Sequence, residues 1–466
     1  MNNNNNLNQG NINNTMEGTA STFTSTDTAN AVTGSPNNES VTSATVIADS
    51  TPLESANPKS IEDLKSFEAK SSKIEENEQD LHKPYGFKVI QVEQPEPILV
   101  GLDSGSTQNR AIVISKKLNS FTQIVIPSRA LKVEQNFNRA IDPGKDNLYD
   151  RMDTTIQCQS ASECTPSLRV CRGGLMGDYN GTPFKISTTQ QKVKTDGFFA
   201  NIRDSIGYAI AMKYKEIPSK VDVYLCVALP PDEQRVVSLV QEFIKNLKGT
   251  YTWTYNPDGI SFEISIKRVV TLSEPEAQVK GFYASNRNMQ VPERVMHIEL
   301  GGRNCGLEVL ENTKSLNRFS KSCYQGGSQL CSALGEELVQ SQKFKRAPKE
   351  EILKEALKTG YIVTGSDKVD VIPEIKTAKN SLAEQIYTDI IAVFDTVPDF
   401  DIYNLNAFTF GGRTFAAGDY NYSVVKPLVE KLKTDAPNFT PIHITKNYIP
   451  LGCIANAAKH FGGILK

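Results

Sequence analysis

The chain has 466 residues, of which 39% are hydrophobic, and its formal net charge is −2. This length and apolar content allow two or more domains with sizeable cores, whereas the near-neutral charge excludes the strongly basic balance of a protein that binds nucleic acid over a whole face. No apolar run approaches the roughly 18 residues that a membrane-spanning helix needs. We therefore expect a soluble, cytoplasmic protein with no direct membrane contact and no strong nucleic-acid signature of its own.

Residues 1–85 differ in composition from the rest of the chain. They are dominated by Asn, Ser, Thr and Glu and contain almost no aromatic side chains. A segment of this kind buries too little apolar surface to offset the entropy lost on ordering. We expect a disordered tail, whose role the sequence leaves open.

The first structured pattern spans residues 98–114, Ile-Leu-Val-Gly-Leu-Asp-Ser-Gly-Ser-Thr-Gln-Asn-Arg-Ala-Ile-Val-Ile. Two apolar runs, 98–102 and 111–114, predict strands on either side of a glycine turn. The backbone N–H groups of the turn can converge on an anion while Asp103 faces a hydrated cation. An ordinary polar hairpin is the alternative interpretation.

The segment from about residue 130 to 192 is rich in turn residues and poor in periodic runs. It contains Cys158, Cys164 and Cys171, which form no Cys-x-x-Cys pair, and the four histidines of the chain are scattered. Without an extracellular signature, this pattern favours reduced thiols over disulfides or a zinc site. The role of these three cysteines stays open.

Strand and helix patterns alternate after residue 194. Residues 195–213 have apolar side chains near helical spacing, and residues 221–229 form an apolar strand that ends at Pro230-Pro231. Further helices are predicted over 328–337 and 381–394. This alternation indicates α/β layers.

Two more glycine turns follow apolar runs. Residues 295–310 repeat the first design, with Glu299 where Asp103 stood and Gly301 and Gly302 where Gly105 and Ser106 stood. The third turn, Phe-Thr-Phe-Gly-Gly-Arg-Thr, occupies residues 408–414. Two carboxylate-headed turns on separate strands indicate two similar half-molecules that face each other.

Together these residues resemble the actin, sugar-kinase and chaperone ATPase superfamily, and most closely the bacterial plasmid-segregating actin-like proteins of the ParM type. The resemblance rests, in order, on residues 103–110, Val-Ala-Leu-Pro-Pro-Asp-Glu at 227–233, Ile-Glu-Leu-Gly-Gly-Arg at 298–303, and Phe-Gly-Gly-Arg-Thr at 410–414. It implies an α/β, actin-like (ribonuclease-H-like duplicated) fold with two similar domains around a nucleotide cleft. The first domain is expected at 94–270, with an insertion at about 130–192, and the second at 271–466.

The resemblance also implies roles for single residues. Asp103 and Glu299 are expected to hold Mg²⁺ through water, and Glu274 to act as the catalytic carboxylate that orients the attacking water, with Glu276 in reserve. Glu299 is a departure, because the family usually has Asp there, and the longer side chain is expected to slow hydrolysis or rearrange the metal shell. The nucleotide contacts are expected from Gly105, Ser106, Thr107, Arg110, Gly301, Gly302, Arg303, Gly326, Gly327, Gly411, Gly412 and Arg413.

The implied function is an ATP-binding, ATP-hydrolysing protein that polymerises into filaments for plasmid or DNA segregation or for cargo positioning. Its implied cofactors are ATP (or GTP) and Mg²⁺, and its implied partners are further copies of itself and a DNA-bound adaptor protein. Two alternatives stay open: a small-molecule, sugar-type kinase of the same fold, and a slowly hydrolysing nucleotide-binding structural protein.

Overall fold

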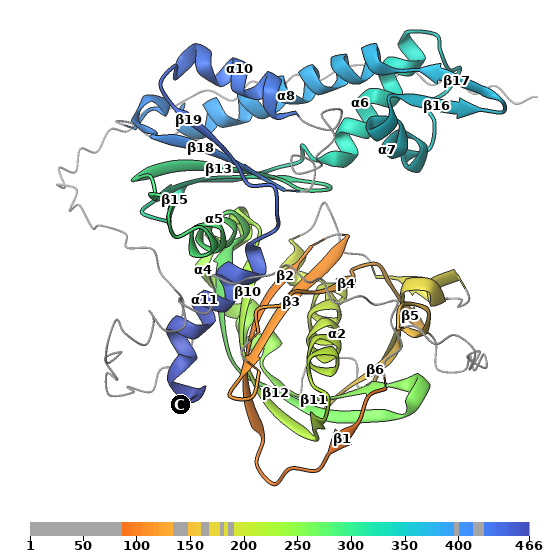
Figure 1. Cartoon of the computed structure of the whole chain (residues 1–466), viewed down its shortest axis with the longest axis vertical. Coiled ribbons are helices and arrows are strands. Elements are labelled where there is room, and N and C mark those ends of the chain that lie inside the picture. The colour runs from red at the N-terminus through yellow and green to blue at the C-terminus, as the bar shows by residue number, and fades with distance from the viewer. Residues whose placement is uncertain are drawn as a thin grey trace, which may run out of the picture. The chain divides into compact units, whose positions relative to one another are not determined.

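The structure is a computed structural model that describes residues 86–105, 107–118, 120–133, 148–159, 167–177, 181–184, 191–395, 400–412 and 424–465 (Figure 1). The predicted tail at 1–85 lies outside these residues, as do the single residues Ser106, Cys164 and Arg413. Within the described ranges, no helix is both long and apolar enough to cross a membrane.

The larger sheet has ten strands: β2 (Glu96–Ser104), β3 (Gln108–Ser115), β4 (Ile124–Pro127), β5 (Ala130–Val133), β6 (Asp153–Cys158), β7 (Leu168–Arg172), β8 (Gly181–Pro183), β10 (Lys220–Leu229), β11 (Gly249–Tyr255) and β12 (Ile260–Ser273). Their order across the sheet is β4-β3-β2-β10-β12-β11-β6-β7-β5-β8. Strands β5 to β8 come from the turn-rich segment at 130–192, so the described part of this predicted insertion extends the sheet beyond β11.

The second sheet has five strands: β13 (Arg294–Leu300), β14 (Cys305–Glu311), β15 (Lys314–Cys323), β18 (Ala407–Gly411) and β19 (Thr440–His443). Their order is β15-β14-β13-β18-β19. Two small pairs complete the described strands: β1 (Val89–Ile90) with β9 (Ile217–Pro218), and β16 (Tyr361–Thr364) with β17 (Asp367–Asp370).

The predicted repetition is visible in the strand directions. In β4-β3-β2-β10-β12, the first two pairings are antiparallel and the next two are parallel, and β15-β14-β13-β18-β19 follows the same rule. Asp103 and Glu299 are each the second-last residue of the strand at the centre of its five-strand unit. The two carboxylates therefore occupy equivalent positions in the duplicated fold.

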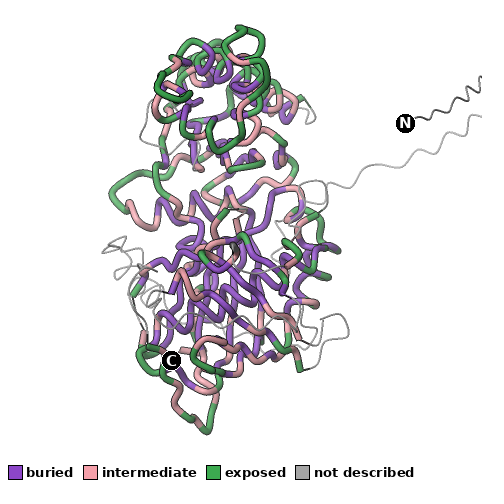
Figure 2. The backbone as a smooth tube through the Cα atoms, turned by 90° about the vertical axis from the view of Figure 1, so that its right-hand side faces the viewer, coloured by how far each residue is buried: buried purple, intermediate pink, exposed green. Residues whose placement is uncertain are grey.

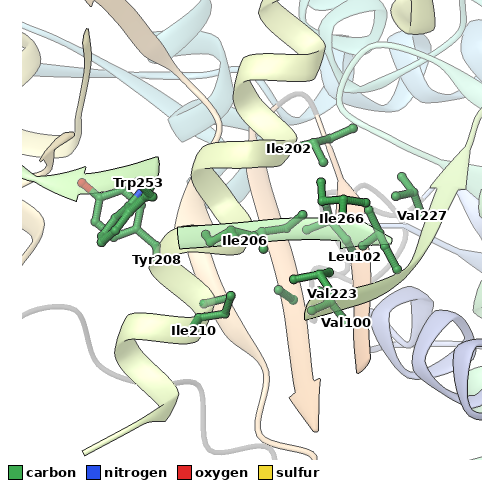
Figure 3. Close-up of a cluster of buried hydrophobic side chains, with 14 of the residues drawn as sticks. Val100, Leu102, Ile202, Ile206, Tyr208, Ile210, Val223, Val227, Trp253 and Ile266 are labelled. Carbon is green, nitrogen blue, oxygen red and sulfur yellow. The ribbon is translucent and has the colours of Figure 1, made fainter. Parts of the chain in front are cut away.

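Helices cover one face of the larger sheet. The side chains of Ile98, Val100 and Leu102 point from β2 into a core that also contains Ile202, Ile206 and Ile210 of α2 (Asp196–Lys213), and Figure 3 shows part of it. Helix α4 (Val237–Leu247) packs on the same core through its apolar stripe. Because successive strand residues point to opposite faces, Leu99, Gly101 and Asp103 face the other way.

The second sheet is covered on one face by α6 (Gly327–Gln340), α7 (Glu350–Thr359), α8 (Ile372–Asp395) and α10 (Val425–Asp435). Their buried side chains meet Ile298, Leu307 and Phe410 of the strands. The predicted helices at 195–213, 328–337 and 381–394 are confirmed as α2, α6 and α8, and the predicted strand at 221–229 is confirmed as β10.

The last helix of each half packs on the sheet of the other half. Helix α5 (Glu274–Ser285) follows the larger sheet but shares a core with Val295, Leu310 and Ala407 of the second sheet. Helix α11 (Ile449–Phe461) follows the second sheet but packs on Leu99, Cys226 and Val270 of the larger one. The predicted division of the chain at residue 270 stays a prediction, which this exchange of helices does not test.

The two exchanged helices cross at glycines. A Cβ on Gly452 would lie 1.9 Å from the backbone oxygen of Ala277, and one on Gly281 would lie 2.2 Å from that of Tyr448. Gly101 makes the same kind of room, because a Cβ there would lie 2.4 Å from the backbone nitrogen of Ile454 in α11. Close backbone contact thus fixes α11 on β2. Figure 2 colours the whole chain by how far each residue is buried.

Candidate functional site

The site begins with Asp103, which lies on the α11 face of β2 and is only 5% exposed. The pKa of this carboxyl is raised to about 6: burial is the largest cause and the nearby Glu274 adds to it, while Arg110, Lys192 and a hydrogen bond from Asn447 oppose the rise. Nδ2 of Asn447 donates to Oδ2 of Asp103 over 2.8 Å, while Oδ1 of Asn447 accepts the backbone N–H of Ile449 in α11. A buried carboxylate whose pKa stays raised despite these partners favours a proton or a cation at this position.

The side chain of Asn109 holds the turn that follows Asp103 through hydrogen bonds. Oδ1 of Asn109 lies 3.0 Å from the hydroxyls of Ser104 and Ser128, and its Nδ2 donates to Oδ1 of Asn201 and to the hydroxyl of Ser205 in α2. Asn109 is fully buried, so these bonds are shielded from competing water. The network joins both ends of the turn, Ser104 and Asn109, to α2.

The structure describes Gly105, Thr107 and Arg110 of the first turn, and their contact with phosphate stays a prediction. A Cβ on Gly105 would lie 2.7 Å from the backbone oxygen of Gln108, so a larger residue does not fit this turn. Thr107 is exposed, and its carbonyl accepts the backbone N–H of Ser128. Arg110 lies opposite Asp103 in the β2–β3 ladder and donates to Oε1 of Gln108 over 2.9 Å.

Glu274 is the first residue of α5. The hydroxyl of Ser273 caps this helix by accepting the N–H of Glu276, so the end of β12 leads directly into a helix N-terminus. Oε1 of Glu274 accepts Nζ of Lys192 over 3.2 Å. Glu276, the reserve candidate, is bound instead to Lys280 one turn further along. Of the two carboxylates, Glu274 is the one whose charge acts on Asp103.

Glu299 is held by a histidine that the sequence reasoning did not single out. Nε2 of His297 lies 2.8 Å from Oε2 of Glu299, and Nδ1 of His297 lies 2.8 Å from the hydroxyl of Thr409 on β18. His297 is fully buried and Glu299 is 8% exposed. The longer side chain of Glu299 is thus fixed sideways towards β18.

The two glycines of the third turn make room for these contacts. A Cβ on Gly411 would lie 2.4 Å from Oε2 of Glu299 and 2.8 Å from Cε1 of His297. Gly412 has φ +95°, and a Cβ there would lie 2.3 Å from the backbone oxygen of Leu300. Both glycines are therefore required by packing on β13, and their predicted contact with adenosine stays a prediction.

The second turn is closed by the start of α6. The carbonyls of Gly301 and Gly302 accept the backbone N–H groups of Gly327 and Ser328 over 3.0 and 2.8 Å. The N–H of Gly326 donates to the side chain of Gln329, and a Cβ on Gly326 would lie 2.5 Å from the backbone of Arg303. In this structure the N–H groups of Gly327 and Ser328 bind the turn, whereas that of Gly326 is bound by the side chain of Gln329. Arg303 is exposed.

The start of α5 packs against the strand that pairs with Glu299. A Cβ on Gly306 would lie 3.3 Å from Cγ of Pro275, and Gly306 is the cross-strand partner of Glu299. Glu274, which precedes Pro275, carries a charge that acts on Asp103. Asp103 and Glu274 therefore lie within reach of each other's charge, and the strand beside Glu299 packs against the start of α5.

Three residues of this region were missed from the sequence: Lys192, His297 and Asn447. Lys192 and Asn447 lie in segments without periodicity, so no spacing pointed to them. His297 stands two residues before Glu299 on one strand, and the two-residue repeat of a strand places both side chains on one face. Within the described residues, no group of three or more His, Cys, Asp and Glu side chains is arranged to hold a metal by itself.

No protein-family model and no curated protein matches the sequence. Solved structures do. A 15-stranded ParM filament from Clostridium botulinum matches with a TM-score of 0.56 and 14% identity over 78% of this chain and 100% of that chain. The archaeal actin homologue Ta0583 matches with a TM-score of 0.55 and 15% identity over 78% and 99%. ParM of Bacillus thuringiensis, solved with AMPPNP, matches with a TM-score of 0.54 and 13% identity over 79% and 99%. Identities this low show the fold, and the predicted actin-like fold is confirmed.

Proposed function

We propose that this actin-like chain binds and hydrolyses ATP, and that it polymerises into filaments that segregate plasmid DNA or position another cargo. The observation that carries the proposal is the buried Asp103 with the charge of Glu274 acting on it, in a duplicated fold that places Glu299 at the strand position equivalent to that of Asp103. Similar structures support it, since one is a ParM filament and others are ParM with ATP or with ADP. The same proposal includes a DNA-bound adaptor protein as partner and leaves GTP as the alternative nucleotide to ATP.

The chemistry needs positioned charges more than covalent steps, because phosphoryl transfer is driven by alignment and electrostatic stabilisation. The turn at Gly105 would present backbone N–H groups to the phosphates, and the guanidinium of Arg110 would offset their charge. Glu274 would orient the attacking water and accept its proton. The turn at Gly301 and Gly302 would close on the phosphates from the other half.

The donor set fits Mg²⁺. Carboxylate oxygens are its preferred protein ligands, and Mg²⁺ is usually held by one or two carboxylates, water and substrate phosphates. Burial has raised the pKa of Asp103, so a cation beside it would relieve an existing cost. Asp103 and Glu299 would hold the ion, which would supply charge stabilisation on the phosphate oxygens.

Purified protein can be tested with Mg-ATP and Mg-GTP by light scattering and phosphate release. We expect nucleotide-dependent scattering and phosphate release from the wild type, and loss of nucleotide binding in Asp103→Ala. Glu274→Gln should bind nucleotide and assemble but release phosphate at least about 100-fold more slowly. Retained binding and turnover in Asp103→Ala would refute the proposed site.

One alternative draws support from the structure. The side chain of Glu299 is bound to His297, which favours a slowly hydrolysing, nucleotide-binding structural protein over a fast ATPase. Scattering that rises with nucleotide while phosphate release stays near background would identify that alternative. Transfer of phosphate to a sugar without any rise in scattering would identify a kinase of this fold.

A further inference from the structure

The unassigned residue nearest to the proposed chemistry is Lys192. It begins a short 3-10 helix, η3 (Lys192–Lys194), directly before α2. Both carboxylate oxygens of Glu233 hold this segment: Oε1 accepts the N–H of Lys192 over 2.8 Å and Oε2 that of Val193 over 3.0 Å. Val193 is buried in the core beside α2 and α4. The backbone at Lys192 is therefore fixed by Glu233 and by the burial of Val193.

The ammonium group of Lys192 reaches the carboxylate of Glu274. The two side chains are 15% and 13% exposed, so the ion pair is largely shielded from water. Burial by itself would lower the pKa of Lys192, but Glu274, Glu233 and Asp103 outweigh it and raise that pKa. Lys192 thus stays charged in a region with three carboxylates.

We propose that Lys192 is a positioning residue for hydrolysis, which holds the carboxylate of Glu274 in the orientation that directs the attacking water. This inference rests on the proposed function. A glutamate side chain at a helix N-terminus has several rotamers, and a fixed cation on one of its oxygens selects among them. In this role, Oε1 of Glu274 is held by Lys192 and Oε2 directs the water.

The chain offers a matched control in Lys194, which belongs to the same turn of η3 and is exposed. Lys192→Met keeps most of the side-chain length but removes the charge, and Lys192→Arg keeps the charge. We expect kcat for phosphate release to fall about 10- to 100-fold in Lys192→Met, since misplacing a catalytic group by about 1 Å costs up to about 100-fold. Nucleotide affinity should stay within about twofold of wild type, because the lysine acts through Glu274.

Lys192→Arg should recover most of the lost rate, and Lys194→Met should match the wild type. In a Glu274→Gln background, Lys192→Met should cause no further loss. An additive loss, or a large drop in nucleotide affinity, would overturn the inference in favour of direct phosphate contact. Thermal melts by circular dichroism check folding, and Lys192→Gln replaces Lys192→Met in all comparisons if the latter does not fold.

The two levels of failure are distinguishable. A wild type that neither binds nor hydrolyses nucleotide would refute the proposed function. A wild type that hydrolyses nucleotide, together with an equally active Lys192→Met, would refute the role of Lys192 alone.

Discussion

Glu308 is a buried carboxyl group that joins the two halves through serine hydroxyls. It lies on β14 and is 1% exposed. It accepts the hydroxyls of Ser315 and Ser320 on β15 and that of Ser273, the cap of α5. The pKa of Glu308 is raised from 4.5 to about 7: burial is the largest cause and the charge of Glu276 adds to it, while hydrogen bonds from the three serine hydroxyls oppose the rise.

A raised pKa in the folded state means that protonation of Glu308 stabilises the fold. This contribution to the free energy of unfolding is fully present at pH values below the pKa of Glu308 in the unfolded chain. It is lost as the pH rises through the pKa of Glu308 in the folded protein. The shift of about 2.5 units corresponds to about 3.4 kcal/mol in all, of which about 2.5 kcal/mol is lost between about pH 5 and 8.5.

Glu308→Gln removes this titration and resembles the protonated form. We expect the free energy of unfolding of Glu308→Gln, relative to wild type, to rise by about 2.5 kcal/mol between about pH 5 and 8.5. Urea unfolding without nucleotide at both pH values measures it, and the difference between the two proteins cancels every other titrating group. The exposed Glu336→Gln on α6 serves as control. A Glu308→Gln difference that does not change with pH would refute the reasoning.

Three further predictions concern the site and its support. The aspartate side chain in Glu299→Asp is too short to keep the contact with His297. We therefore expect unchanged nucleotide binding and a several-fold change in turnover. Equal rates in both forms would remove Glu299 from the metal shell. Asn109→Ala leaves buried hydroxyl and amide groups unpaired and should cost about 2–4 kcal/mol in urea unfolding; a cost under about 0.5 kcal/mol would show that the network does not hold the turn. Gly452→Ala forces a Cβ against the backbone of Ala277, so a thermal melt should show destabilisation by about 1–3 kcal/mol or more, whereas an unchanged melting temperature would contradict the close helix crossing.

Strand and helix periodicity predicted much of the fold. The runs at 98–102 and 295–300 alternate or remain apolar over the lengths of strands, and they were found as β2 and β13. The turn-rich segment at 130–192 gave no such signal. Its described strands β5 to β8 depend on pairing with one another and with β11, which is remote in sequence, so tertiary contacts rather than local pattern decide them.

By itself, the sequence determined the two carboxylate-headed turns and their equivalence, because a short-range pattern of apolar residues, acid and glycine specifies strand, turn and strand. Only the tertiary structure decided what surrounds those carboxylates. The exchange of α5 and α11 between the sheets places Glu274 near Asp103 and Asn447 on it, and segment packing brings Lys192 to Glu274. These contacts join residues tens to hundreds of positions apart, and such distances leave no periodic trace in a sequence.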